Sequence, residues 1–248
     1  MAVLTSISAL AQDPTIKGMR DESGRNIKKD PNDTIPKGWK LGGTYGVNLS
    51  QGALSNWAAG GDDFSISVNS ILSAYAFYKK EKHSWDNTLD FNLGYVRTSS
   101  LGTRKNDDRI DILSKYGYAL TSKLNAAALF NFRSQFFKGY TYDADGGKTF
   151  SSNFLSPAYI LVSPGLDYKP WPELSIFLSP VTARWTIVKD DSLSAKGLYG
   201  VIPCKHSEGE FGAFASINYL MEFNKYISLK SRLDLFSNYE NNPQNVDL

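Results

Sequence analysis

From Trp39 onward, apolar and polar positions alternate with a period of two. Over 39–50, aromatic, aliphatic or glycine residues occupy the odd positions, and polar or very small residues occupy the even positions. Because successive side chains of a β-strand point to opposite faces of the sheet, this pattern predicts a strand with one apolar and one polar face.

The alternation returns in eight further segments, which makes nine predicted strands. These segments lie at 64–78, 85–95, 110–120, 124–132, 158–168, 174–187, 211–223 and 227–235. In 174–187 the phase changes at Pro180, which predicts a bulge or bend. Most of the strands run to about ten residues or more, which is the length that a tilted transmembrane β-strand needs, about 9–11 residues. The uncharged run 149–166 contains two prolines and four serines, so no transmembrane helix is expected there.

The connections between the predicted strands alternate between short and long. The short ones lie at 79–83, 121–123, 169–173 and 224–225, and the long ones at 51–63, 97–108, 138–157, 189–210 and from 238 onward. This sorting is typical of outer-membrane barrels, with short periplasmic turns and long extracellular loops. Aromatic residues also gather near strand ends, at Trp39, Tyr78, Trp85, Tyr95, Tyr118, Tyr168, Trp171, Trp185 and Tyr226. They suggest the girdles of a membrane barrel, although tyrosine and tryptophan also favour strands in general.

The predicted fold is therefore all-β: an antiparallel up-and-down transmembrane β-barrel over 38–248. In lipid, a sheet must close because bare strand edges would leave backbone groups without partners. Nine strands are an odd number, whereas single-chain bacterial barrels usually have even numbers. Val246–Leu248 has the character of the start of another strand. We expect ten or twelve strands in all, a barrel that is incomplete at its C-terminal side, and a gap or strained closure between 227–237 and 39–50.

The first 37 residues differ from the rest. Residues 1–11 are apolar and end in Ala9-Leu10-Ala11, a triplet that signal peptidase accepts. They predict a signal peptide clipped at its start, because the basic n-region is missing; an apolar tail is the alternative. Residues 12–37 mix six basic and five acidic residues with three prolines and show no period. We interpret this segment as a flexible periplasmic tether.

The composition limits the chemistry. With 27 Lys+Arg and 25 Asp+Glu, the net charge is +2, too small to indicate nucleic-acid binding. A single cysteine excludes an internal disulfide, and two histidines leave little material for a metal site. The fragment Asp143-Ala144-Asp145-Gly146-Gly147 lacks the later ligands of a calcium loop. We expect neither a metal nor another cofactor.

Charged residues of both signs occupy the polar face of the predicted strands. They are Lys40, Asp86, Asp90, Asp111, Lys115, Arg133, Glu222, Lys230, Arg232 and Asp234. They could line a polar pore that selects solutes, or pair with one another and fill the interior; we favour the filled interior. The outer loop that holds His206, Ser207, Glu208 and Glu210 could serve a hydrolase only if His206 activated a nucleophile, and a solvated polar loop is the simpler interpretation.

Several stretches resemble an uncharacterised β-barrel family of Bacteroidetes outer-membrane proteins, a domain of unknown function. They are Trp39-Lys40-Leu41-Gly42-Gly43, Asn56-Trp57-Ala58-Ala59-Gly60-Gly61, Ser156-Pro157-Ala158-Tyr159, Ser163-Pro164-Gly165-Leu166-Asp167-Tyr168 and Phe177-Leu178-Ser179-Pro180. The resemblance runs from about residue 38 to the end. It implies an outer-membrane barrel and no known activity, so it assigns no catalytic residues.

We therefore expect a non-enzymatic protein of the bacterial outer membrane, either a narrow or plugged channel or a structural or assembly component. Its expected partners are outer-membrane lipid and other outer-membrane or periplasmic proteins. One alternative is a surface binding protein that acts through its long loops, with Trp57, Tyr140, Phe150 and Phe154 as anchors. A hydrolase with a site at the rim is a weaker alternative.

Overall fold

The computed structural model describes residues 38–53, 64–143, 147–171, 173–224, 227–239 and 246–247. Ten strands of this part form one sheet in the order β1-β2-β3-β4-β5-β8-β9-β10-β11-β12, and β6 and β7 form a separate hairpin. The predicted signal peptide, the predicted tether and the candidate anchor Trp57 lie outside the described residues.

The nine long strands of the sheet correspond one to one with the nine predicted strands. They are β1 (Gly38–Ala53), β2 (Phe64–Lys80), β3 (His83–Thr98), β4 (Gly102–Ala119), β5 (Leu124–Ser134), β8 (Ala158–Trp171), β9 (Leu174–Ile187), β10 (Ser207–Asn224) and β11 (Ile227–Asn238). The short β12 (Val246–Asp247) pairs antiparallel with β11, at the place where the sequence indicated a further strand. All pairs in the sheet are antiparallel, which confirms the predicted class and order.

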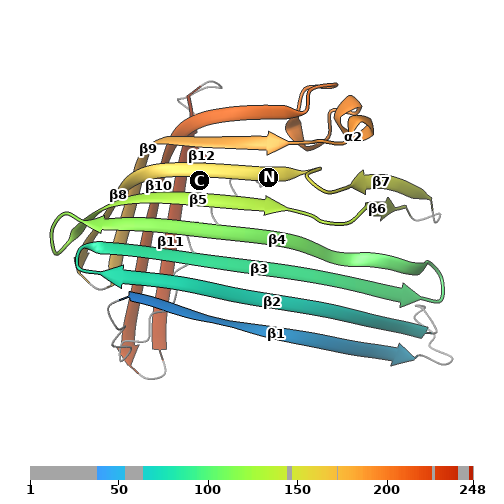
Figure 1. The fold of residues 1–248 in the computed structure, drawn as a ribbon, viewed down its shortest axis with the longest axis horizontal. Helices are drawn as coiled ribbons and strands as arrows, with labels where there is room; N and C mark the ends of the chain where they lie inside the picture. The colour runs from blue at the N-terminus through green and yellow to red at the C-terminus, as the bar shows by residue number, and fades with distance from the viewer. Residues whose placement is uncertain are drawn as a thin grey trace, which may run out of the picture.

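The two ends of the sheet differ in their connections. At one end, here the turn end, Glu81 and Lys82 join β2 to β3, and residues 120–123 join β4 to β5. At the other, the loop end, the β5–β8 connection carries β6 (Gly139–Tyr142) and β7 (Lys148–Ser152), and the β9–β10 connection carries α2 (Asp191–Ala195) and η1 (Leu198–Gly200). Figure 1 shows β6, β7 and α2 gathered at one end of the sheet, opposite the β2–β3 and β4–β5 turns.

The predicted long connection at 97–108 is wrong. β3 and β4 continue to pair as far as Thr98 and Gly102, and only residues 99–101 separate the two strands. Gly102 has φ +67°, the left-handed conformation that glycine adopts without strain. Charged residues break the apolar alternation here, but backbone ladder bonds do not depend on side-chain polarity, so the hairpin extends beyond its apolar part.

The sheet is strongly twisted and curled. In Figure 1, β1–β5 cross the view in front while β10 and β11 run steeply behind them. Among the described residues, β1 pairs with β2 alone, and β1 and β12 stand at opposite ends of the strand order. Within the described ranges, no pairing therefore closes the sheet between β1 and β12.

The predicted slip at Pro180 is confirmed as a bulge. The β9–β10 register shifts between the pairs Ser179–Phe214 and Thr182–Gly212, so two residues of β9 face one residue of β10. Proline has no N–H for the ladder, and the bulge accommodates it. Val181, the second bulge residue, is exposed, and the shifted apolar phase that the sequence indicated begins with it.

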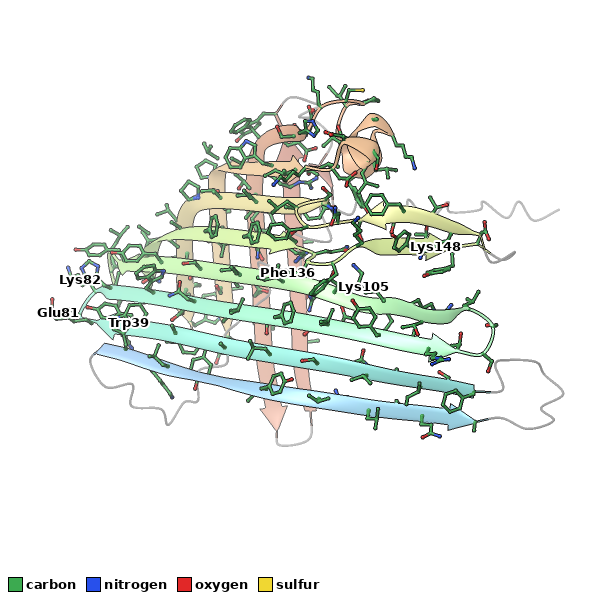
Figure 2. All side chains as sticks on the ribbon, turned by 45° about the vertical axis from the view of Figure 1, so that its right-hand side comes forward. Trp39, Glu81, Lys82, Lys105, Phe136 and Lys148 are labelled. Atoms are coloured by element: carbon green, nitrogen blue, oxygen red, sulfur yellow. The ribbon has the colours of Figure 1, made fainter. Side chains whose placement is uncertain are left out.

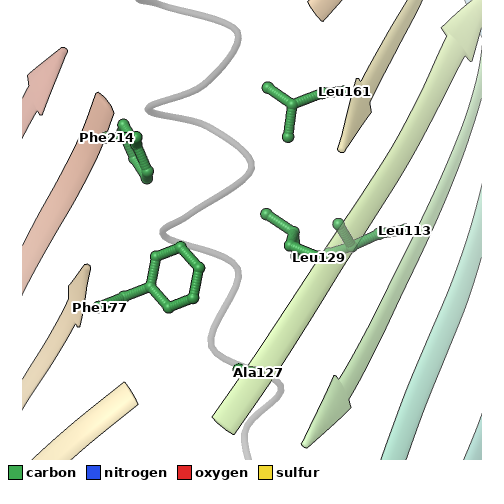
Figure 3. Close-up of a cluster of buried hydrophobic side chains, with 6 residues drawn as sticks. All are labelled: Leu113, Ala127, Leu129, Leu161, Phe177 and Phe214. Atoms are coloured by element: carbon green, nitrogen blue, oxygen red, sulfur yellow. The ribbon is translucent and has the colours of Figure 1, made fainter. Parts of the chain in front are cut away.

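The two faces of the sheet follow the predicted alternation in part. On the convex face of β1, Trp39, Leu41, Tyr45, Val47 and Leu49 are 50–73% exposed. On the concave face, an apolar cluster is 3–7% exposed and comprises Leu113, Ala127, Leu129, Leu161, Phe177 and Phe214. Figure 3 shows Phe177 and Phe214 facing the leucines across the concave side. The inner face is thus not purely polar, because large apolar side chains occupy its middle. No helix in the described ranges is long and apolar enough to cross a membrane.

Candidate functional site

Asp111 is the centre of a charged group on the concave face. Its side chain is fully buried; Asn131 Nδ2 donates to Oδ1 over 2.8 Å, and Arg133 Nε donates to Oδ2 over 3.4 Å. The strand register places Asp90 beside Asp111, and Ser73 Oγ donates to Asp90 Oδ1 over 2.6 Å. Three of the predicted network residues, Asp90, Asp111 and Arg133, therefore lie in one row across β3, β4 and β5.

A second ion pair, which the sequence analysis missed, lies near the loop end. Arg184 Nη2 is 3.3 Å from Glu210 Oε2, and the Arg184 guanidinium lies 5.9 Å from the centre of the Tyr159 ring. Glu210 had been assigned to a loop, but β10 already begins at Ser207. Arg184 alternates with the apolar Ala183 and Trp185, and this alternation was the signal that could have placed it on the inner face.

At the turn end, Asp167 gathers a third group. Its carboxylate lies 3.1 Å from Lys169 Nζ and 3.5 Å from Lys115 Nζ, and it accepts a hydrogen bond from Ser175 Oγ over 2.9 Å. A pocket of 320 Å³ opens beside this group; Asp86 and Lys115, both predicted network residues, line it. The sequence pattern included Lys115 in the predicted network but did not identify Asp167 as its partner, because 52 residues separate the two.

The remaining predicted network residues are less fully described. The register places Lys40 opposite Phe77 in the β1–β2 pair. For Glu222, Lys230, Arg232 and Asp234 only the backbone is described, in β10 and β11, where Arg232 pairs with Asn218 and Asp234 pairs with Ser216. The structure therefore brings Asp90, Asp111 and Arg133 together, places Asp86 and Lys115 at a separate pocket, and leaves the side chains of the last four outside the described part.

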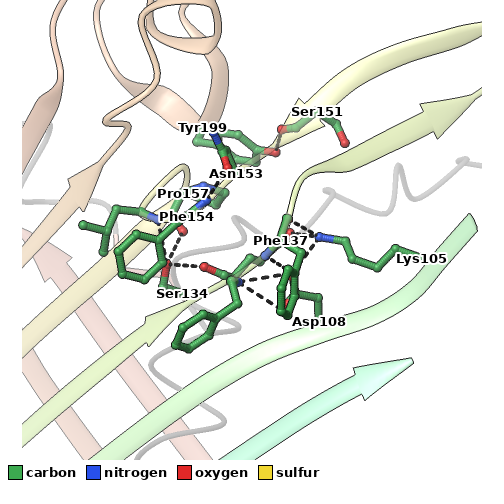
Figure 4. A network of polar contacts seen from close by, with 12 residues as sticks. Lys105, Asp108, Ser134, Phe137, Ser151, Asn153, Phe154, Pro157 and Tyr199 are labelled. Carbon is green, nitrogen blue, oxygen red and sulfur yellow. Dashed lines mark hydrogen bonds and ion pairs between the residues drawn. The ribbon is translucent and has the colours of Figure 1, made fainter. Parts of the chain in front are cut away.

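At the loop end, Asp108 clamps β4 to the chain that leaves β5. Its carboxylate accepts hydrogen bonds from the Phe136 and Phe137 amides, the latter over 2.8 Å. Lys105 Nζ donates to Asp108 Oδ2 over 2.7 Å and to the Phe137 carbonyl over 2.6 Å (Figure 4). The clamp holds the start of the β5–β8 connection against the extended β3–β4 hairpin. It was missed because its residues fell in a predicted loop.

The two long connections form one packed loop unit with its own apolar core. Val188, Leu193 and Val201 are buried, and Phe150, Leu198 and Tyr199 pack against them. The Tyr199 hydroxyl donates to the Ser151 carbonyl, so β7 is tied to the β9–β10 connection. Burial raises the pKa of Tyr199, which keeps this hydroxyl protonated as a donor.

Asp190 links the same two connections by capping α2. Its Oδ1 accepts hydrogen bonds from Ser192 Oγ and from the Ser192 and Leu193 amides, while its Oδ2 accepts one from Asn153 Nδ2 over 3.2 Å. These hydrogen bonds, that of the Ser192 hydroxyl first, lower the pKa of Asp190. Such a cap satisfies amides at the start of a helix that have no partner within it.

The rim residues considered for hydrolysis form only part of a catalytic arrangement. His206 Nε2 lies 3.5 Å from Asp191 Oδ1, and His206 Nδ1 lies 3.0 Å from the Val188 carbonyl. In the part of the chain that the structure describes, no serine, threonine or cysteine side chain hydrogen-bonds to His206. Within the same ranges, no cluster of three or more histidine, cysteine, aspartate or glutamate side chains could hold a metal ion.

The candidate loop anchors divide into two kinds. Tyr140 and Phe154 are 37% and 44% exposed at the loop end, and the Phe154 ring lies 5.3 Å from that of Phe136. Phe150, in contrast, packs against the core of the loop unit. Two of the described anchors are therefore available to a partner, and Phe150 supports the loop from within.

Comparison with known proteins yields one match. A family model described as a protein of unknown function, DUF3078, matches residues 49–140. This span runs from the end of β1 into β6, so it includes β2–β5, Asp111 with Arg133, and the Asp108 clamp. It is shorter than the resemblance expected from the sequence, which continued to the C-terminal end. No curated protein and no solved structure matches the chain.

Proposed function

We propose that this chain is an outer-membrane β-barrel protein with a largely filled interior and a structural, assembly or narrow-channel role rather than a catalytic one. The observation that carries the proposal is a row of aromatic residues at the turn end of the convex face. Trp39, Tyr78, Trp85 and Tyr116 are consecutive neighbours across β1–β4. The Trp39 ring lies 5.1 Å from that of Tyr78 and 5.7 Å from that of Trp85.

The spacing of the aromatic residues fits the thickness of a bilayer. On β3, Trp85 stands at the turn end, and Tyr95, on the same face, stands ten residues further along. At about 3.3 Å per residue and a tilt of about 40°, the two rings are separated by a height of about 25 Å, which is the height of the apolar band of such barrels. Leu89, Phe91 and Leu93 occupy the face between them.

Polar atoms within this band find partners on the protein. Trp85 Nε1 donates to Ser114 Oγ over 2.8 Å, and Ser114 Oγ donates to Asn87 Oδ1 over 2.7 Å. Asn87 Nδ2 in turn donates to the Ala76 carbonyl over 3.2 Å. Because lipid offers no hydrogen-bond partners, this relay is what a polar group near the edge of an apolar band requires.

The filled interior is supported by the apolar cluster on the concave face. Leu113, Leu129, Leu161, Phe177 and Phe214 project toward the concave side from strands β4, β5 and β8–β10 (Figure 3). With the sorting of the connections, this arrangement favours the turn end as the periplasmic side and the loop end as the extracellular side. Outer-membrane lipid is the proposed partner of the convex face.

Site-directed spin labelling tests this proposal directly. In a Cys204→Ser background, which removes the single cysteine, labels are placed one at a time at Leu89, Phe91, Asp90 and Asn92, and the protein is folded into lipid vesicles. Labels at Leu89 and Phe91 should be relaxed by oxygen, which concentrates in lipid, and labels at Asp90 and Asn92 should be shielded from it. Equal oxygen access at all four positions, or a protein that stays in the aqueous phase, would overturn the proposal.

The loop unit favours a second candidate function, surface binding at the loop end. Loops with their own core hold their exposed residues in fixed positions, which lowers the entropy lost on binding. Tyr140 and Phe154 are then the anchors. Pulldown from native membranes with the wild type, with Tyr140→Ala/Phe154→Ala and with a control Lys196→Ala variant would reveal a partner that the double variant alone loses.

A further inference from the structure

We propose that the pocket at the turn end binds a small solute that carries a phosphate or carboxylate group. The pocket is formed by the β2–β3 turn and by β4, β5 and β8. Its lining includes four lysines, Lys79, Lys82, Lys115 and Lys169. Figure 2 shows Glu81 and Lys82 at this end, near Trp39. The anion site itself does not depend on the proposed function. The proposed function determines only the side of the membrane to which the pocket opens.

The inner wall of the pocket holds Lys115 and Lys169 beside two carboxylates, Asp86 and Asp167, so the extra positive charge of the pocket comes from its rim. Asp167 is 3% exposed, and Lys115 and Lys169 share its single carboxylate at 3.5 and 3.1 Å. A third donor, Ser175 Oγ, also bonds to this carboxylate. Each lysine ammonium has three N–H donors, so both lysines keep donors that Asp167 does not use. An anion in the pocket would accept them and balance the extra charge.

The rim of the pocket adds two lysines that can close over such an anion. Lys79 lies at the end of β2 and Lys82 in the β2–β3 turn, and the ion pairs of the described residues include neither of them. Four lysines thus face three carboxylates around the pocket, Glu81, Asp86 and Asp167, which leaves a net charge of +1. Lysine is a flexible point charge that suits phosphate or carboxylate oxygens arriving from different directions.

The size of the pocket restricts the ligand to a small solute. Its volume of 320 Å³ lies at the lower end of ligand sites, about 300–1,000 Å³. Gly117, Ala119 and Ala127 line it with little side-chain volume. A Cβ at Gly117 would lie 2.8 Å from Ser84 Oγ, closer than real contacts allow. The glycine therefore leaves room for the Ser84 side chain at the wall of the pocket.

Isothermal titration of the full chain in neutral detergent tests the proposal, with inorganic phosphate and succinate as probes at constant ionic strength. We expect saturable binding of at least one probe. In Lys79→Gln/Lys82→Gln the affinity should fall at least about tenfold, which corresponds to about 1.4 kcal/mol. The matched control Lys196→Gln/Lys205→Gln removes the same charge at the loop end and should bind as the wild type does.

The other possible outcomes of the titration also decide whether the pocket is an anion site. Equal affinity in both double variants, or no saturable binding in the wild type, would overturn the proposal. Binding of short-chain phosphatidylglycerol without binding of the free anions would assign the anion to a lipid headgroup and would overturn the solute site. Lys115→Gln should also weaken binding, but it alters the surroundings of Asp167, so the rim variant carries the test. Because titration in detergent needs no bilayer, its result is independent of the spin-label experiment on membrane insertion.

Discussion

Replacement of Leu89 by arginine should destabilise the protein in lipid more than the same replacement nearer either end of the apolar part of the convex face of β3. The height of the apolar band runs from Trp85 to Tyr95, and Leu89 and Phe91 lie on either side of its midpoint. At about 2.5 Å of height for each residue of a tilted strand, Leu89 lies about 10 Å above Trp85 and about 15 Å below Tyr95. Arginine at the midplane costs about 2–4 kcal/mol.

The depth of each position then sets the order of the effects. Leu93 stands two residues from Tyr95, about 5 Å below the girdle, so Leu93→Arg should cost less, about 1 kcal/mol, since the cost falls to about 0–1 kcal/mol near the interfaces. Asn92 lies on the concave face opposite Arg109. Asn92→Arg therefore meets only like-charge repulsion across the strand pair, up to about 1 kcal/mol.

Reversible folding into vesicles, followed by tryptophan fluorescence over a guanidinium titration, measures these free energies. Leu89→Ala serves as the control for the lost apolar side chain. If Leu93→Arg cost more than Leu89→Arg, the depth assignment would be wrong. If Asn92→Arg cost as much as Leu89→Arg, the assignment of the two faces would be wrong.

Three further predictions concern the interior and the loops. Asp111→Ala should cost about 1–3 kcal/mol in a chemical denaturation assay, because the buried Asn131 amide and the Arg133 guanidinium would lose the carboxylate that accepts their hydrogen bonds; a loss below about 0.5 kcal/mol would contradict a structural role for this carboxylate. Because the pKa of Asp190 is lowered from its ordinary 3.8, its cap stabilises α2 above that pH and is lost as pH falls through the lowered value. Hydrogen exchange at the amide of Leu193 should therefore accelerate below about pH 4 relative to core amides, and Asp190→Asn should remove this pH dependence. Trypsin added to intact cells should cut at Lys196 in the loop unit but not at Arg104, which the structure places within β4; cleavage at Lys123 instead would invert the topology.

The strands were predictable from the sequence because each is a local pattern. Period-two alternation and short turns determine which residues pair when consecutive strands are joined as hairpins, so the β2–β3 register runs without a shift from Ser65–Thr98 to Lys80–His83. Pro180 was also informative, because a residue without an N–H disturbs a ladder wherever it occurs in the middle of a strand. These features need no knowledge of distant contacts.

The charged partners and the loop unit were not predictable in the same way. Asp167 meets Lys115 only because β5 lies between their two strands, and no local pattern specifies which lysine a distant carboxylate finds. Residues 97–108 lack apolar alternation, so the sequence suggested a loop where the backbone continues a ladder. Val188, Leu193 and Val201 are irregularly spaced, so their common core follows from how the chain folds back rather than from periodicity.

The inward side of β5 shows why the expectation of an interior filled by paired charges needs revision. Along this face the residues are Asn125, Ala127, Leu129, Asn131 and Arg133, so the strand is polar toward both ends and apolar in between. Leu129 and Ala127 belong to the same buried cluster as Phe177 and Phe214 of β9 and β10. Ion pairs therefore lie toward both ends of the concave face, while hydrocarbon lies between them. In the proposed barrel, an apolar stretch of this kind would favour loss of water from the middle of the interior, and the polar groups would then form separate sites at the two ends.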